Sequence, residues 1–318
     1  MLRNKVLLYD GSQVSSQVIE AEGALRWASW RPDGSEALIV GNKGTILAYS
    51  VDRKGVRNVS SPVKANLRGV EFSPDGRLAV IVGNGGTILL LSDLLRRLES
   101  ATSSNLRRAA WKPDGTGALI MGNEGAAYFL ASRGLKRVYG VGNNLRSAAW
   151  HPKEDYAVVV GNSVKATLAG LVPAPGFYRF DTNSFFLTQI RQISPETPKD
   201  LTCVGWKPDG SKCIIVGYDQ TWHTSELYFF DGKSVTASDW KEENLLPTGF
   251  AWHPSGRYGL IVTGGMNRGE TGRVLSYDGA RPSVIHQEPD YNISCVTWNP
   301  RGSYALILGS RGARSFSA

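Results

Sequence analysis

The sequence predicts an all-β fold, a seven-bladed β-propeller made of four-stranded antiparallel blades. The first observation is a large aromatic residue that recurs at intervals of 42, 39, 39, 56, 46 and 46 residues, close to the roughly 40–45 expected for one propeller blade. These anchor residues are Trp30, Phe72, Trp111, Trp150, Trp206, Trp252 and Trp298. The second observation is that the same turn and strand signals follow each anchor.

A turn signal begins two residues after each anchor. Pro-Asp-Gly or a close variant starts at Pro32, Pro74, Pro113, Pro208, Pro254 and Pro300. Proline presets φ, aspartate bonds nearby backbone and glycine accepts positive φ, so this tripeptide favours a tight turn between antiparallel strands. The fourth copy has Pro152-Lys153-Glu154-Asp155 instead, and we expect a different conformation there.

Short apolar runs follow these turns, for example at residues 37–40, 80–82, 158–160, 214–216 and 306–308. They do not alternate with polar residues, which indicates strands covered on both faces, as in stacked propeller blades. Gly-Asn-x-Gly ends the first three runs, and further strands are expected after it. Asp-Gly pairs that follow Tyr9, Phe230 and Tyr277 predict type I′ turns between third and fourth strands.

The repeats leave no room for a second domain, since 318 residues divided among seven blades is about 45 per blade. We expect blades one to six to begin near residues 25, 67, 106, 145, 201 and 247. The seventh blade would combine residues 293–318 with residues 5–18, which removes a free sheet edge. In the alternative, Ala313 to Ser317 supply a third strand, and the N-terminus adds only one.

The Trp-x-Pro-Asp-Gly repeats resemble those of the broad WD-repeat-like propeller superfamily, especially its prokaryotic members. The resemblance covers nearly the whole chain. The Trp-Asp and Gly-His pairs of eukaryotic WD repeats are missing, so their Asp–His hydrogen-bond network is not implied. Most members of the superfamily are binding platforms, and the resemblance therefore favours interaction over catalysis, with no cofactor.

Cysteine usage and hydropathy favour a cytoplasmic protein. Cys203, Cys213 and Cys295 lie in predicted strands without Cys-x-x-Cys spacing, which indicates buried free thiols in a reducing compartment. The apolar run after Arg3 and Lys5 is too short for a signal peptide. No apolar stretch approaches the roughly 18 residues of a membrane helix, and we expect no membrane partner.

Basic charge gathers in the first half of the chain. Residues 1–150 hold 20 Lys and Arg against 12 Asp and Glu, whereas residues 151–318 hold 16 of each. Four residues before the anchors stand Arg26, Arg68, Arg107 and Arg146, followed in the later copies by Thr202, Thr248 and Ser294. We call the four arginines the arginine arc. They are expected near the mouth of the central channel on the face that carries the loops between blades, here called the top face.

Two interpretations of the arginine arc stay open. A residue that repeats in register can hold loop carbonyls or stack on a neighbouring aromatic ring. Guanidinium groups also suit phosphates and carboxylates, because they present a rigid fork of donors. The second interpretation predicts an anionic ligand or a nucleic acid, bound with a strong dependence on salt.

The second half of the chain has stretched loops between its second and third strands, at residues 163–176, 218–226 and 264–272. Insertions in repeat proteins usually collect on the binding face. Trp222 lies in one of these loops and Trp240 lies in the connection that follows, so we expect exposed aromatic groups there. Candidate protein-binding residues are Trp222, Trp240, Tyr218, His223 and Met266. In the alternative, both indoles cover the tops of the blades.

An enzyme is the weakest interpretation, because the chain has four histidines and no evident constellation. His223 near Asp239 and Glu242 is a candidate metal or acid–base site. The chain therefore predicts a non-catalytic platform that binds a protein or peptide, acidic in character, on the top face over blades four to six. The alternatives are a nucleic-acid or anionic-ligand binder that uses the arginine arc, and a hydrolase or lyase at the channel mouth.

Overall fold

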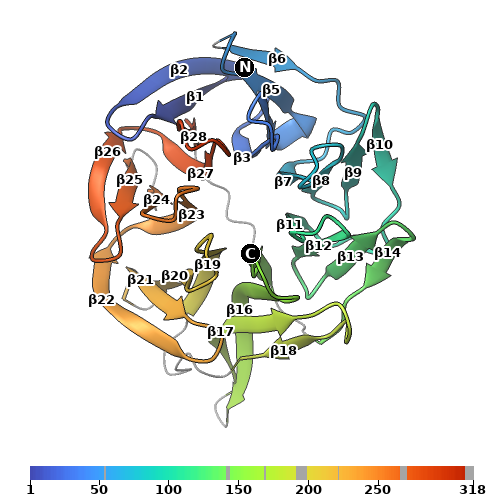
Figure 1. Ribbon diagram of the computed structural model, residues 1–318, viewed down its shortest axis with the longest axis vertical. Helices are drawn as coiled ribbons and strands as arrows, with labels where there is room; N and C mark the ends of the chain where they lie inside the picture. Colours follow the sequence, from blue (N-terminus) through green and yellow to red (C-terminus); the bar gives the residue numbers. More distant parts are fainter. Residues whose placement is uncertain are drawn as a thin grey trace.

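Seven antiparallel sheets of four strands each stand in a ring around a common axis (Figure 1). The computed structural model describes residues 1–53, 55–140, 144–167, 170–190, 199–220, 222–265 and 271–311. The predicted seven-bladed propeller is confirmed. Within these residues, no helix is long and apolar enough to cross a bilayer.

The chain fills the ring in sequence order, from the innermost to the outermost strand of each blade. Blade 1 has β3 (Leu25–Trp30), β4 (Glu36–Gly41), β5 (Ile46–Ser50) and β6 (Gly55–Asn58), with a short 3-10 turn, η1 (Asn42–Gly44), after β4. Blade 2 has β7 (Leu67–Phe72), β8 (Ala79–Gly83), β9 (Ile88–Leu91) and β10 (Leu95–Leu98). Blade 3 has β11 (Leu106–Trp111), β12 (Gly117–Gly122), β13 (Ala127–Ala131) and β14 (Gly134–Arg137).

The later blades repeat this order with longer strands. Blade 4 has β15 (Leu145–Trp150), β16 (Ala157–Thr167), β17 (Gly170–Phe180) and β18 (Leu187–Gln189). Blade 5 has β19 (Lys199–Trp206), β20 (Cys213–Asp219), β21 (Thr224–Phe230) and β22 (Val235–Glu243). Blade 6 has β23 (Leu246–Trp252), β24 (Gly259–Gly264), β25 (Gly272–Tyr277) and β26 (Ser283–Glu288).

Blade 7 is assembled from both ends of the chain. Its inner strands are β27 (Asn292–Trp298) and β28 (Ala305–Ser310), and its outer strands are β1 (Leu2–Tyr9) and β2 (Val14–Ala21). β1 pairs with β28 from Asn4 opposite Ser310 to Tyr9 opposite Ala305. The predicted closure by strands from both termini is therefore confirmed, with two strands from each. Ala313 to Ser317, the alternative third strand, lie outside the described residues.

The core is divided among the seams of the ring. Seven clusters of buried apolar side chains each join two neighbouring blades. Second strands such as β8 and β20 are buried along their length. This burial on both faces explains why the apolar runs do not alternate. The three cysteines are free and buried, as expected.

Anchor indoles tie neighbouring blades together. The indole nitrogen of Trp111 donates to the Glu71 carbonyl at 3.1 Å, and that of Trp150 donates to the Ala110 carbonyl at 2.9 Å. Trp30 and Trp252 make the same contact with the preceding blade. Each of these hydrogen bonds adds about 1 kcal/mol to the stability that apolar burial gives the ring.

The turns between third and fourth strands differ from the type I′ prediction. Tyr9 pairs with Val14, so a four-residue loop separates the strands. Gly11 has φ of 99°, but Asp10 is not among the residues with positive φ, which a type I′ turn would require. Instead, the Asp10 carboxylate accepts hydrogen bonds from the backbone N–H groups of Ser12 and Gln13. The prediction of type I′ was wrong because the aspartate closes a longer loop.

The expected loop at residues 163–176 is largely a β-hairpin. β16 and β17 stay paired from Ala157 opposite Phe180 to Thr167 opposite Gly170, and the hairpin projects beyond the ring in Figure 1. In blade 5 the strands also lengthen, so that Asp219 pairs with Thr224. Most of the third stretch, residues 266–270, lies outside the described residues.

Ring closure should depend on the packing of the N-terminal strand. Leu7 in β1 is fully buried in the cluster that joins blades 6 and 7. Leu7→Ala should therefore lower the free energy of unfolding by about 2–5 kcal/mol. Val18 in β2 is 50% exposed, and Val18→Ala should change stability by less than about 0.5 kcal/mol. Urea denaturation of both variants tests this, and equal effects would argue against a closing role for β1.

Candidate functional site

Each member of the arginine arc lies at a β-bulge near the start of an inner strand. In blade 1, Leu25 pairs with Gly41 and Trp27 pairs with Val40, so Arg26 has no partner on β4. Arg68, Arg107 and Arg146 likewise have no pairing partner on the second strand of their blades. A bulge re-aims the side chain of the extra residue. The fold thus directs four guanidinium groups to the top end of the ring axis.

An asparagine holds the guanidinium group in each of the first three blades. The Nε atoms of Arg26, Arg68 and Arg107 donate to asparagine Oδ1 atoms at 3.0, 2.8 and 2.7 Å. The acceptors are Asn42, Asn84 and Asn123, which directly follow the glycine that ends each second strand. The terminal nitrogens of these three arginines have no hydrogen-bond or ion-pair partner among the described residues. The guanidinium groups are therefore held in a fixed orientation, and their terminal N–H groups remain available to bind a ligand.

Arg146 differs from the other three arginines. Its Nη2 atom donates to Asp200 Oδ2 at 3.2 Å, across the seam to blade 5. Its Nε atom is buried and has no hydrogen-bond partner in the described part of the chain. Asp200 thus offsets part of the positive charge at the blade 4 end of the arc.

The arginines are close enough to repel one another. Burial and the charge of Arg68 lower the pKa of Arg26 to about 10. Burial, together with the charges of Arg146, Arg68 and Arg108, lowers the pKa of Arg107 to about 9. At these pKa values Arg26 and Arg107 remain charged at neutral pH, so a concentrated positive potential develops where they lie.

Arg108 adds a further guanidinium group next to the arginine arc. Its guanidinium group lies 3.5 Å from the ring centroid of Trp27 and donates to the backbone carbonyls of Arg68 and Arg107. Trp27, which is off register with the anchors, is thereby engaged in a cation–π contact between blades.

On the opposite side of the ring, hydroxyl groups occupy the same bulge position. Thr202 and Thr248 donate to the carbonyls of Val216 and Val262 at 3.2 and 3.1 Å, and Ser294 donates to the Leu25 carbonyl at 3.1 Å. These hydroxyl protons hold the backbone at the bulge instead of facing an anion. The hydroxyl groups and the Nε atoms of the arginines therefore have a structural role, as the first of the two interpretations predicts.

The aromatic residues of blade 5 separate into exposed and buried ones. Trp222 is 70% exposed on the turn between β20 and β21, whereas Tyr218 is 5% and Trp240 is 2% exposed. Trp240 packs in the cluster between blades 5 and 6, because its side chain points inward from outer strand β22. The expectation that Trp240 and Tyr218 are exposed was wrong. Met266 lies outside the described residues.

The structure does not bring His223 together with the two carboxylates expected near it. His223 Nδ1 lies 2.9 Å from the Tyr218 hydroxyl, Glu242 faces Arg273 at 3.7 Å, and Asp239 is exposed. No group of three His, Cys, Asp or Glu side chains that could hold a metal occurs in the described residues. The proposed metal or acid–base site is therefore not assembled.

Glu71, which the sequence analysis did not single out, is a half-buried carboxyl group on inner strand β7. Burial raises its pKa to about 8, although a hydrogen bond from the Trp111 backbone lowers it in part. At neutral pH the group is mostly protonated, so it does not cancel the charge of the arginines. Within the described residues, no histidine or second carboxylate pairs with it to form an acid–base couple.

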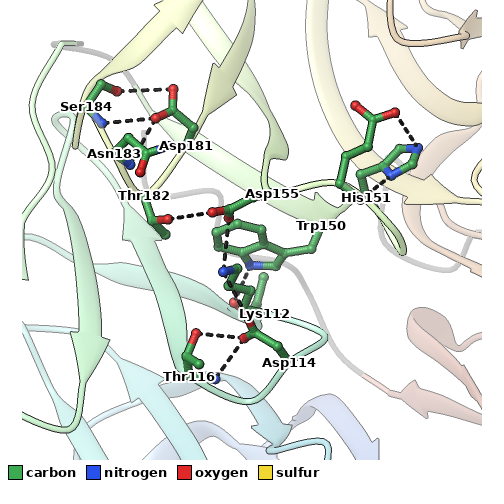
Figure 2. Close-up of polar contacts among 12 residues, drawn as sticks. Lys112, Asp114, Thr116, Trp150, His151, Asp155, Asp181, Thr182, Asn183 and Ser184 are labelled. Atoms are coloured by element: carbon green, nitrogen blue, oxygen red, sulfur yellow. Dashed lines mark hydrogen bonds and ion pairs between the residues drawn. The ribbon is translucent and has the colours of Figure 1, made fainter.

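On the bottom face, the side with the Pro-Asp-Gly turns, polar groups serve the fold. Figure 2 shows Lys112 bridging Asp114 and Asp155 at 2.8 and 3.1 Å, with Thr182 donating to Asp155. In the irregular fourth turn, His151 Nδ1 accepts the backbone N–H of Glu154 at 2.9 Å. The regular turns use the backbone carbonyl of the residue after the anchor instead. The predicted difference in conformation is confirmed.

The residue after the anchor also links neighbouring blades on this face. The Nε2–H groups of His151 and His253 donate to the carbonyls of Gly210 and Gly302, both at 3.1 Å. Arg31 and Asn299 make the equivalent contact with Gly76 and Gly34. These histidines are structural ties between turns.

Comparison with solved structures finds propellers over almost the whole chain. The β-propeller domain of Cps50 (Swd1) from Myceliophteria thermophila has a TM-score of 0.64 at 12% identity, over 91% of this chain and 97% of that one. A chain of the mitotic checkpoint complex has a TM-score of 0.68 at 13% identity, over 94% and 91%. A chain of Kuenenia stuttgartiensis hydrazine synthase gives 0.68 at 16%, over 89% and 92%.

These likenesses show the fold alone, which is a β-propeller. Neither family models nor curated proteins match the sequence.

Glu71→Gln should remove a pH dependence of stability. Folding raises the pKa of this carboxyl group from 4.5 to about 8, so the folded state holds a proton that the unfolded chain releases. Wild type should lose stability relative to the variant as pH rises from 4.5 to about 8, by at most ~1.4 kcal/mol per pH unit. Urea denaturation at pH 5, 7 and 8.5 measures the difference, and a constant difference would contradict the burial effect.

Proposed function

We propose that the protein is a non-catalytic binding platform that holds an acidic segment of a partner protein on its top face. The observation that carries this proposal is the arrangement of Arg26, Arg68 and Arg107. Their Nε atoms are fixed by asparagines, while their terminal nitrogens are unpaired among the described residues. Such a fork of donors matches a carboxylate, and pre-orientation reduces the entropy lost on binding.

A protein partner accounts for a second feature of the same face. Trp222 is exposed on the β20–β21 turn of blade 5, the same blade whose Asp200 meets Arg146. Large exposed aromatic side chains are typical anchors of protein interfaces. An acidic segment that crosses from the arginine arc toward blade 5 would use carboxylates at one end and an apolar residue at the other. The propeller neighbours are compatible with this role but do not specify it.

Removal of two arc arginines should weaken binding strongly. Arg68→Ala with Arg107→Ala removes two charge-assisted contacts, so affinity for a labelled glutamate-rich peptide should fall at least about 10-fold, and the salt dependence of binding should become shallower. Fluorescence anisotropy at two salt concentrations measures both. The matched control is Arg96→Ala with Arg97→Ala, which removes the same charge from exposed outer strand β10 and should bind as wild type.

Two outcomes would contradict this proposal. If both double variants lose affinity equally, general charge rather than the oriented arc attracts the peptide. If single-stranded DNA of equal charge binds through Arg68 and Arg107 while the peptide does not, the platform is a nucleic-acid binder. A pull-down from host lysate with and without nuclease identifies which of the two the protein carries.

Trp222→Ala should affect a complete partner but not a simple acidic peptide. The side chain lies on a surface turn, so its loss should leave folding stability within about 0.5 kcal/mol of wild type. Affinity for the captured partner should fall by about 2 kcal/mol or more, as for an interface hot spot, whereas affinity for the glutamate-rich peptide should not change. Titration calorimetry with both ligands checks this, and an unchanged partner affinity removes Trp222 from the interface.

A further inference from the structure

A pocket of about 480 Å³ opens on the bottom face, at the seam between blades 5 and 6. Its walls include Lys207, Ser211 and Lys212 from blade 5, with Trp252, Ser255, Arg257, Tyr277 and Asp278 from blade 6. We call it the seam pocket. Its volume lies in the range of small-molecule sites.

Neighbouring seams are filled by a tyrosine at a fixed place in the repeat, six residues after the anchor. Tyr156 packs edge-on against Trp206 at 5.9 Å between ring centroids, and Tyr258 packs against Trp298 at 5.5 Å. In both blades, the histidine after the anchor stacks on that tyrosine, at 5.2 Å for His151 and 4.7 Å for His253. A histidine–tyrosine stack thus covers the next anchor.

Blade 5 has lysine at both of these positions. Lys207 replaces the histidine and Lys212 replaces the tyrosine, so the histidine–tyrosine stack that covers Trp206 and Trp298 is missing at Trp252. The Lys207 stem takes the place of the imidazole, since its Cε atom would lie 3.4 Å from a Cβ added at Gly256. The pocket at this seam is therefore explained by the missing tyrosine ring at position 212, since the Lys207 stem fills the place of the imidazole.

Three basic side chains line the seam pocket, Lys207, Lys212 and Arg257, against the one acidic side chain of its lining, Asp278, so its charge is positive on balance. Lys207 is paired with Asp209 at 2.8 Å. Lys212 lies over the ring of Phe229 at 4.8 Å from its centroid, and Arg257 is exposed. Neither Lys212 nor Arg257 has an ion-pair partner among the described residues. Two cationic groups at the rim are thus available to an anion, beside the indole of Trp252.

Tyr277 forms a further wall of the seam pocket and has an unsatisfied hydroxyl group. The side chain is 1% exposed, and its hydroxyl has no hydrogen-bond partner in the described part of the chain. An enclosed polar group without a partner costs about 1–3 kcal/mol.

We propose that the seam pocket binds a small organic phosphate, with its phosphate between Lys212 and Arg257 and a planar ring against Trp252. Lysine and arginine are the usual protein partners of a phosphate dianion. Aromatic side chains with a few placed polar groups are typical of ligand pockets. This site lies on the bottom face and does not depend on the arginine arc.

The test uses the complete chain and three probes: adenosine 5′-monophosphate, inorganic phosphate and adenosine. Equilibrium dialysis should show binding of the nucleotide, at least 10-fold weaker binding of inorganic phosphate, and none of adenosine. Equal affinity for nucleotide and inorganic phosphate would overturn the role of Trp252. Absence of nucleotide binding at millimolar concentration would overturn the proposal.

Two variants separate loss of the pocket from loss of the charge. Lys207→His with Lys212→Tyr installs the pair that blades 4 and 6 already use, so it should fold with at least wild-type stability and lose nucleotide binding at least 10-fold. Lys212→Gln with Arg257→Gln keeps the pocket open and changes exposed side chains, and it should lose binding to the same degree. The control Lys64→Gln removes an exposed charge from another blade and should bind as wild type. Wild-type affinity in either double variant would refute the site.

Discussion

The packing of one blade against the next is the constraint on which this molecule depends. Second strands such as β8 and β12 are apolar along their length and buried on both faces, so a blade without neighbours would expose them to water. The anchor at the end of each inner strand crosses the seam, and several anchor indoles donate to a carbonyl of the preceding blade. Each blade therefore requires two neighbours, and a ring is the arrangement that supplies them to all seven.

Closure of the ring explains the division of blade 7. An open ring would leave one seam without its covering blade and one inner strand pair without outer strands. β1 and β2 complete the sheet of β28 and β27, so the first residues of the chain are joined to nearly the last described ones. Non-local contacts of this kind cost loop-closure entropy before they contribute stability. The extensive burial of β1 compensates for this cost.

Much of the architecture could be predicted because packing imposes the same residues on every blade. The anchor interval, the turn tripeptide and the unalternating apolar runs all follow from burial between sheets. The exposed state of individual aromatic residues could not be predicted, since it depends on strand register. Trp240 belongs to an outer strand whose other side chains are mostly exposed, and its inward orientation appears only when β22 is placed.

The role of the Gly-Asn pair was also missed. The pair follows the end of a second strand, as expected, but Asn84 and its equivalents also accept hydrogen bonds from arginines that precede them by 16 residues. The signal was present, because the asparagine and the arginine occur together in the first blades, and Thr or Ser replaces arginine where the pair is absent. The hydrogen bond between the two residues could not be predicted, because it depends on the β-bulge, which turns the arginine side chain toward the second strand.

The same logic indicates where function resides in a repeated fold. A residue that packing requires recurs around the ring, so a position where neighbouring blades differ carries information that packing does not. The bulge position tolerates both arginine and hydroxyl residues, because an arginine there binds an asparagine side chain and a hydroxyl group binds a backbone carbonyl. Only arginine also leaves donors unused, and it is confined to consecutive blades. Stability alone does not require that distribution, whereas the proposed acidic partner, which would cover one side of the ring, accounts for it.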